Sequence, residues 1–172
     1  MTLMANLVRP RSRGTVRLKS ADPTDDALVD PNWLHDDEDT KRLVEAIRYL
    51  RGIAAHEPFA SIVKAEVGPG LQLQSDDELS EYIRRTTESN YHPVGTCRMG
   101  HPDDPMSVLT PDLQVKGVTG LRVFDASMMP SIISSNTDAT VMAVADRAVD
   151  IMMSSATVSP AASDRSYAMQ PE

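Results

Sequence analysis

The segment Tyr91–Gly100, with the sequence Tyr-His-Pro-Val-Gly-Thr-Cys-Arg-Met-Gly, constrains the fold of this chain more than any other. It has little of the apolar spacing that marks a helix or a strand, so it predicts irregular backbone. Pro93 fixes a backbone dihedral and Gly95 permits close approach of the main chain, so we expect His92 to be held rigidly. An imidazole on irregular backbone is a common way to place an acid or a base beside a cleft.

The composition is that of one ordinary globular domain, with 172 residues, 41% hydrophobic and 24% charged. A net charge of -8 argues against a protein that binds nucleic-acid phosphates. The single cysteine excludes an internal disulfide and cannot build a zinc site alone, and no metal is predicted. The apolar run Leu3–Val8 is too short for a signal peptide or a membrane span. These features predict a cytoplasmic protein without a nucleic-acid or membrane partner.

The first twenty residues predict a β-hairpin. Residues Met1–Val8 are apolar and compatible with a strand, and Arg9–Gly14 has the composition of a turn. The next segment, Thr15–Ser20, alternates with a period of two, which is typical of a strand with one buried face. No leader precedes the first strand, so we expect the chain to begin within a larger fold.

A loop and a helix are expected to follow the hairpin. Residues Asp22–Asp39 are rich in Pro, Asp and Asn and predict a loop, with Trp33 and Leu34 as its anchors. Apolar residues at helical spacing then predict an amphipathic helix over Asp39–His56. Acidic residues at its start favour this assignment, because they complement the helix dipole.

Two further helices are predicted. The sequence Ser75–Glu78 is a capping box, and the apolar residues after it indicate a helix that ends near Ser89. A longer helix is predicted over Thr137–Met153. Its expected packing face consists of Val141, Val144, Ala145, Ala148, Val149 and Met152. The remaining segment, Ser154–Glu172, is rich in Ser, Ala and Pro and predicts a disordered tail.

His92 and Cys97 are candidates for chemistry. An unperturbed imidazole titrates near pH 6.5, so His92 could take up or give a proton near neutral pH. His35, His56 and His101 are expected on the surface. A thiol nucleophile paired with His92, or a metal site of His92, Cys97 and His101, lacks a fitting sequence pattern. We therefore expect Cys97 to be a small, partly buried side chain.

Two polar residues near the last predicted helix each allow two interpretations. The apolar run Leu121–Ser127 predicts a buried strand, and Asp125 near its end is either a capping carboxylate or a ligand contact. Asn136 is either the N-cap of the helix or a hydrogen-bond donor to a bound oxygen. The roles proposed for Asn136 are compatible, because a helix start also presents free N–H groups.

Three segments resemble the C-terminal part of the glucose–methanol–choline (GMC) flavoprotein oxidoreductases: Leu7–Gly14, Tyr91–Gly100 and Gly117–Pro130. The resemblance extends from about Thr2 to Met153, in family order. In that family FAD takes a hydride from an alcohol carbon. The resemblance implies an α+β fold, in which an antiparallel sheet with flanking helices is followed by a strand and helix of an incomplete FAD-binding domain.

The resemblance also implies domain boundaries and roles for individual residues. It assigns residues 1–118 to the substrate-binding domain, 119–153 to the FAD-binding domain and 154–172 to the tail. His92 corresponds to the catalytic base, and Asn136 to the residue that hydrogen-bonds the substrate oxygen. Asp125 and Ala126 correspond to contacts with the FAD pyrophosphate and ribityl chain. Thr137 begins the helix whose backbone faces the flavin pyrimidine edge.

The sequence departs from the family pattern at two places. The family begins with a G-x-G-x-x-G turn for the ADP pyrophosphate, whereas Gly68–Leu73 lacks the third glycine and opens no helix. Near position 138 relatives often carry Asn or Pro, and this chain has Asp138. A carboxylate there opposes the stabilisation of a reduced flavin unless it caps the helix and faces away.

We therefore expect the C-terminal portion of an FAD-dependent oxidoreductase that acts on the CH–OH group of alcohols, without its nucleotide-binding half. As an isolated chain it is expected to bind FAD weakly or not at all and to be inactive. A separately encoded N-terminal half is a candidate partner. The alternative is a non-catalytic remnant or interaction module with the same fold.

Overall fold

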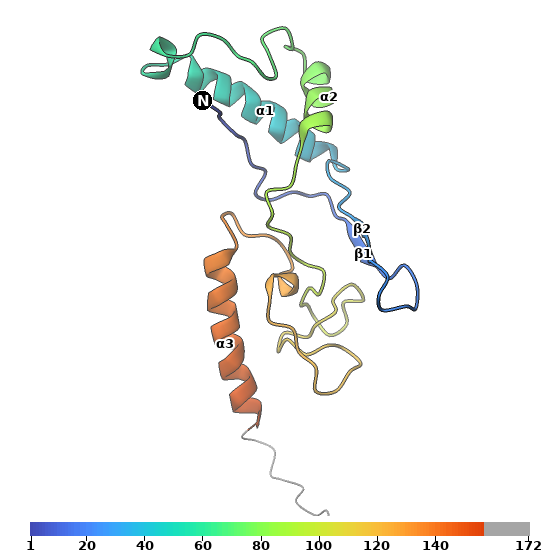
Figure 1. Ribbon diagram of the computed structural model, residues 1–172. Coiled ribbons are helices and arrows are strands. Elements are labelled where there is room, and N and C mark those ends of the chain that lie inside the picture. Colours follow the sequence, from blue (N-terminus) through green and yellow to red (C-terminus); the bar gives the residue numbers. More distant parts are fainter. Residues whose placement is uncertain (157–172) are drawn as a thin grey trace, which may run out of the picture.

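The computed structural model describes residues 1–156 of the chain (Figure 1). It contains a two-stranded antiparallel sheet and three α-helices, which is an α+β composition. The elements are β1 (Thr15–Arg17), β2 (Leu28–Asp30), α1 (Asp37–Ala54), the 3₁₀ turn η1 (Phe59–Ser61), α2 (Asp76–Thr86), the 3₁₀ turn η2 (Ala126–Met128) and α3 (Asp138–Ala156). Helices α1 and α2 lie together at one end of the molecule, and α3 lies at the other.

Local sequence signals determine where α1 and α2 begin. The Asp36 carboxylate accepts a hydrogen bond of 2.9 Å from the N–H of Glu38, which caps α1. The predicted capping box of α2 is present, with reciprocal bonds between Ser75 and Glu78. Both predicted helices are confirmed, although α2 ends at Thr86 rather than near Ser89. Acidic side chains in both first turns also complement the helix dipoles.

The first core cluster joins α1, α2 and the loop before α1. It consists of Leu34, Val44, Leu79 and Ile83, with Leu43, Ile47 and Leu73 packed against it. Leu34 is therefore the anchor that the sequence predicts. Trp33 is 53% exposed, so its predicted anchoring role is wrong.

A buried carboxylate, Asp39, fixes the turn Arg9–Gly14 against α1. It accepts hydrogen bonds from the N–H groups of Arg11 and Ser12, both at 2.8 Å, and from the Ser12 hydroxyl at 2.6 Å. Burial raises the pKa of Asp39, but these bonds and the Arg42 charge outweigh it and hold the pKa below its ordinary value. The ionised form is thus the one that the fold stabilises.

The predicted hairpin between Met1–Val8 and Thr15–Ser20 is wrong. Strand β1 pairs with β2, with Thr15 opposite Asp30, and every residue of both strands is exposed. The chain before β1 contains no strand and runs towards the helices instead (Figure 1). The reason is the attachment of Arg9–Gly14 to α1, which directs the N-terminal residues away from β1. The predicted loop Asp22–Asp39 accordingly contains β2.

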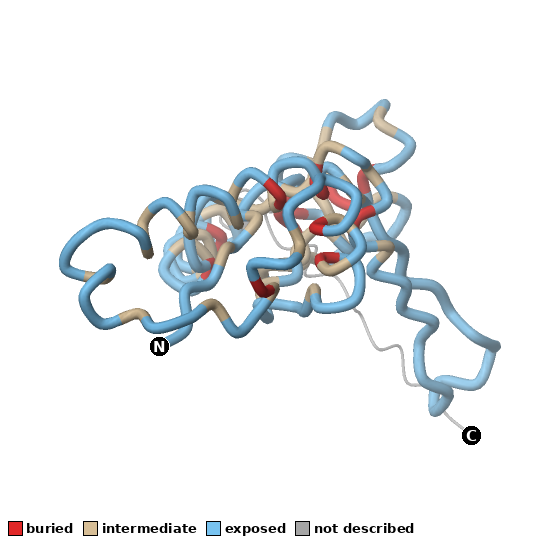
Figure 2. The backbone as a smooth tube through the Cα atoms, turned by 90° about the horizontal axis from the view of Figure 1, so that it is seen from above, coloured by how far each residue is buried: buried red, intermediate tan, exposed pale blue. Residues whose placement is uncertain are grey.

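The second core cluster is built from irregular chain and one face of α3. Its buried residues are Leu109, Leu113, Met128, Met129 and Ala148. The predicted packing residues Val141, Val144 and Ala145 are half-buried, whereas Val149 and Met152 are 49% and 41% exposed. Figure 2 shows buried residues as short segments within a largely exposed backbone.

The predicted buried strand Leu121–Ser127 is also wrong. Only Arg122 forms an isolated bridge, to Gln114, and η2 begins at Ala126. Within residues 1–156 this segment has no second neighbouring strand, so its apolar residues pack on the cluster without joining a sheet. The sheet of the described chain is accordingly only β1 and β2. The predicted tail lies outside the described residues, except that Ser154–Ala156 belongs to α3.

The Asp39 contacts make stability depend on pH. We expect Asp39→Asn to lower the free energy of unfolding by about 1.5–3 kcal/mol at pH 7, because a neutral amide replaces a charged acceptor. A lowered folded-state pKa gives stability that is present above the ordinary value near 3.9 and is lost as the pH falls through the folded value. The difference between wild type and variant should therefore shrink below about pH 4. Urea unfolding followed by circular dichroism measures this difference.

Asp37→Asn is the matched control, because Asp37 also lies in the first turn of α1 but its side chain is largely exposed. We expect it to cost less than about 1 kcal/mol. Equal losses in the two variants would contradict the anchoring role of Asp39.

Candidate functional site

The segment that carries His92 has irregular backbone, as the sequence predicts. Tyr91 adopts a φ of 60°, a left-handed conformation that is unusual for a bulky residue, and its N–H donates to the Ser89 hydroxyl at 3.0 Å. Gly95 has a φ of 91°, and a Cβ at this position would lie 3.3 Å from the carbonyl oxygen of Met129. Both the conformation and the close approach therefore favour glycine there.

Main-chain hydrogen bonds attach this segment to the turn η2. The N–H of Cys97 donates to the carbonyl of Ser127 at 3.0 Å, and the N–H of Met99 donates to the carbonyl of Met128 at 2.8 Å. Two alternate residues of the His92 segment thus donate main-chain hydrogen bonds to two successive residues of η2. These two bonds bring the His92 segment beside the predicted cofactor residues Asp125 and Ala126.

Asp125 caps η2, which agrees with the capping interpretation of its carboxylate. One carboxylate oxygen, Oδ1, accepts from the N–H of Ser127 at 2.8 Å and from the Ser127 hydroxyl. The residue is exposed, and its other oxygen, Oδ2, has no hydrogen-bond partner within residues 1–156. The cap leaves that oxygen open to a ligand.

His92 lies against the start of α3. Its Nδ1 atom is 3.1 Å from the hydroxyl oxygen of Thr137. The side chain is half-buried, and in the described part of the chain its Nε2 atom has no hydrogen-bond partner. One ring nitrogen is therefore held by α3, and the other is open to a bound molecule.

The predicted N-cap at Asn136 is wrong by one residue. Helix α3 begins at Asp138, and the carbonyl of Thr137 accepts the first helical bond, from Val141 at 2.9 Å. Asn136 is exposed, and its side-chain amide forms no hydrogen bond to any described residue. Because the amide does not cap the helix, it is available to a ligand.

His92 contacts Thr137, and Asn136 precedes Thr137 in the chain. Asp125 and Ala126 are connected to the His92 segment through the main-chain bonds of η2. His35, His56 and His101 are exposed and Cys97 is half-buried and free, as expected. Over the described residues no three His, Cys, Asp or Glu side chains are grouped to hold a metal ion.

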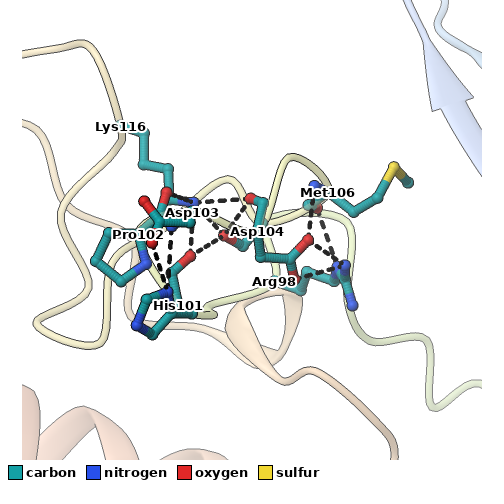
Figure 3. Close-up of polar contacts among 8 residues, drawn as sticks. Arg98, His101, Pro102, Asp103, Asp104, Met106 and Lys116 are labelled. Carbon is teal, nitrogen blue, oxygen red and sulfur yellow. Dashed lines mark hydrogen bonds and ion pairs between the residues drawn. The ribbon is translucent and has the colours of Figure 1, made fainter.

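A polar cluster that the sequence did not indicate stiffens the loop after the His92 segment (Figure 3). The Arg98 guanidinium donates to both carboxylate oxygens of Asp104, at 2.9 and 3.2 Å, and to the carbonyl of Met106 at 3.0 Å. The Lys116 ammonium donates to three carbonyl oxygens, those of His101 at 3.0 Å and of Pro102 and Asp104 at 2.9 Å, and to the Ser107 hydroxyl. Arg98 follows Cys97 directly, so this cluster also supports the main-chain bonds to η2.

Comparison with known proteins identifies the family of this chain. A family profile described as GMC oxidoreductase matches residues 10–145. Choline oxidase of Arthrobacter globiformis is 48% identical over 155 residues, covering 89% of this chain and 28% of that protein. An alcohol dehydrogenase (acceptor) of Pseudomonas putida is 46% identical over 144 residues, covering 84% and 26%.

Solved structures agree. An FAD-dependent oxidoreductase from Chaetomium thermophilum superposes with a TM-score of 0.82 at 30% identity, covering 88% of this chain and 26% of that one. This chain belongs to the GMC oxidoreductase family and matches its C-terminal region, as the sequence motifs predicted. It spans about a quarter of the length of these relatives. None of the helices in residues 1–156 is long and apolar enough to cross a membrane.

The close approach at Gly95 can be tested by substitution. We expect Gly95→Ala to lower the free energy of unfolding by more than the roughly 1–2 kcal/mol of left-handed backbone strain, because the added Cβ also presses on the Met129 carbonyl. Hydrogen exchange of the Met99 amide should become faster, since its bond to Met128 is adjacent. Urea unfolding and amide exchange measure the two effects.

Gly117→Ala is the control, because Gly117 has a φ of 76° but nothing within 4 Å of the added Cβ. It should show the backbone strain without the faster exchange at Met99. If both variants exchange alike at Met99, the close approach does not hold the segment in place.

Proposed function

We propose that this chain forms the substrate-facing and C-terminal portion of an FAD-dependent oxidoreductase that acts on the CH–OH group of alcohols. His92 is the base that takes the proton of the substrate hydroxyl, and Asn136 hydrogen-bonds the substrate oxygen. The observation that carries the proposal is the 3.1 Å contact from Nδ1 of His92 to Thr137, which leaves Nε2 open beside the start of α3.

The chemistry of an alcohol oxidation fits these two side chains. Hydride leaves the carbon more easily when the hydroxyl proton is leaving too, so a base within hydrogen-bond reach lowers the barrier. The Nε2 atom of His92 supplies such a base. The unused amide of Asn136 can donate to the same substrate oxygen, which orients the C–H bond for transfer.

The residues around α3 also fit FAD, which when bound would supply the hydride acceptor. The N–H groups of residues 138–140 have no acceptor within residues 1–156, and they lie at the positive end of the helix dipole. Such a helix start suits the anionic edge of a reduced flavin. At the turn of Asp125 and Ala126, the open carboxylate oxygen of the exposed Asp125 suits a ribityl hydroxyl as donor, whereas the anionic pyrophosphate that the resemblance implies needs an N–H donor instead.

Asp138 is the family departure that bears on this fit. It is the first residue of α3, is exposed, and forms no hydrogen bond or ion pair with any residue that the structure describes. The Asp138 side chain therefore neither caps the helix nor pairs with a cation among the described residues. Its carboxylate weakens the positive potential at the helix start, so FAD binding must draw on groups outside this chain.

The outer surface of α3 indicates where those groups attach. Met142, Val149 and Met152 are exposed on one side of the helix, and an open hollow of about 480 Å³ with lining residues Leu113, Met128 and Ala148 lies on another. Exposed apolar side chains that gather on one side of a helix commonly mark a surface that another element covers. We assign residues 1–118 to substrate binding and residues 119–153 to the FAD-binding domain, whose remaining part, on the same or a separate chain, covers α3.

The role of His92 is testable in a chimera in which this chain replaces the matching 28% of the Arthrobacter globiformis choline oxidase. We expect His92→Ala to slow flavin reduction by roughly 10²–10⁴-fold, because the substrate hydroxyl loses its base. Anaerobic stopped-flow absorbance of the flavin measures this rate. His35→Ala, which alters an exposed histidine without hydrogen bonds to described residues, should reduce the flavin as fast as the parent. If His92→Ala matches His35→Ala, His92 is not the base.

The isolated chain is expected to retain no flavin. After incubation with excess FAD and desalting, it should show no absorbance near the flavin bands, because we expect most FAD contacts to come from a nucleotide-binding portion that these 172 residues do not contain. A yellow chain that oxidises alcohols by itself would overturn the assignment of the cofactor contacts.

A further inference from the structure

Thr137 is buried at the start of α3, and its hydroxyl contacts His92 rather than the helix. It is only 8% exposed, and its carbonyl accepts the first helical bond of α3, so it stands at the N-cap. A threonine there normally accepts hydrogen bonds from N–H groups of the first turn. Here its hydroxyl forms no such bond to the described residues and lies 3.1 Å from Nδ1 of His92 instead.

A histidine that acts as a base needs one particular tautomer. A neutral imidazole carries its proton on one nitrogen and presents a lone pair on the other. If Nδ1–H donates to the Thr137 oxygen, Nε2 carries the lone pair and can accept a proton. If the Thr137 hydroxyl donates to Nδ1, the ring proton is on Nε2, and the open nitrogen cannot act as a base.

We propose that Thr137 is the positioning residue that selects the Nδ1–H tautomer of His92 and so leaves Nε2 free to take the substrate proton. This inference rests on the proposed role of His92. The Thr137 oxygen accepts Nδ1–H both before and after His92 takes up a proton, so the ring does not move during the transfer. A partner on the second ring nitrogen commonly fixes tautomer and orientation in this way.

The attachment of Thr137 to α3 gives this contact its rigidity. Its backbone is held by the bond from Val141, and α3 is packed into the second core cluster through Ala148, with Val144 against it. The base is therefore anchored to a packed helix end as well as to its own segment. Loss of the hydroxyl alone leaves that packing intact.

The decisive measurement is the tautomer of His92 by ¹⁵N NMR of the imidazole, at a pH where the ring is neutral, in the full 172-residue chain and in the choline oxidase chimera. We expect a protonated Nδ1 and an unprotonated Nε2 in wild type. Thr137→Val should shift the equilibrium towards the Nε2–H form, and Thr137→Ser should restore the wild-type signals. Thr140→Val, the same change one turn further along α3, should leave them unchanged.

Kinetics in the chimera give a second readout. Thr137→Val should lower the high-pH plateau of kcat/KM for flavin reduction by roughly 10–100-fold, and Thr137→Ser should recover most of it. Unchanged ¹⁵N signals in Thr137→Val, or an equal loss in Thr137→Ser, would overturn the role of Thr137. If His92→Ala reduces flavin normally, the proposed base fails instead, whatever the tautomer measurement gives.

Discussion

The main-chain bonds from Cys97 to Ser127 and from Met99 to Met128 are the constraint on which the rest of the site depends. The half of the molecule that contains α3 has no sheet among its described residues, so these bonds replace the usual ladder between strands. They connect the His92 segment to η2, which leads into α3. Gly95 permits the close approach of the His92 segment to the carbonyl of Met129. The Arg98–Asp104 ion pair and the hydrogen bonds of Lys116 hold the loop that follows this segment.

Local signals in the sequence predicted the helices well, and long-range contacts explain the failures. Periodicity and caps are properties of neighbouring residues, which is why α1, α2 and α3 were found. The partner of β1 depends on Asp39, which turns the N-terminal chain towards α1 through contacts 27 and 28 residues apart in sequence. The sequence did contain a signal for the burial of Asp39. This residue precedes Leu43 and Ile47 at intervals of four and thus lies on the packing side of its helix.

His92, Asn136 and Thr137 were proposed as site residues from the sequence, and their roles in the site stay predictions. The sequence did not predict which of these residues caps α3, and a shift of one residue in the helix start explains this difference. Because α3 begins at Asp138, the N-cap is Thr137 and not Asn136, so the Asn136 amide does not cap the helix. The Thr137 hydroxyl contacts His92. Sequence patterns locate helix ends only to within a residue or two, so they could not assign these two roles. The prediction of a buried strand over Leu121–Ser127 failed because apolar character does not specify a strand partner.

In the proposed function, helix α3 links the base His92 to the rest of the enzyme. Its N-cap residue, Thr137, carries the hydroxyl that contacts His92, and its outer side leaves Met142, Val149 and Met152 exposed. These side chains are already partly buried, so covering each one contributes less than the roughly 1.5–3 kcal/mol of a fully exposed side chain, and together they favour association of the remaining FAD-binding portion with α3. That association would also immobilise the helix end that contacts His92. The proposed base would therefore be most rigidly held once the proposed cofactor-binding portion is in place, and proton removal and hydride acceptance would then be assembled together.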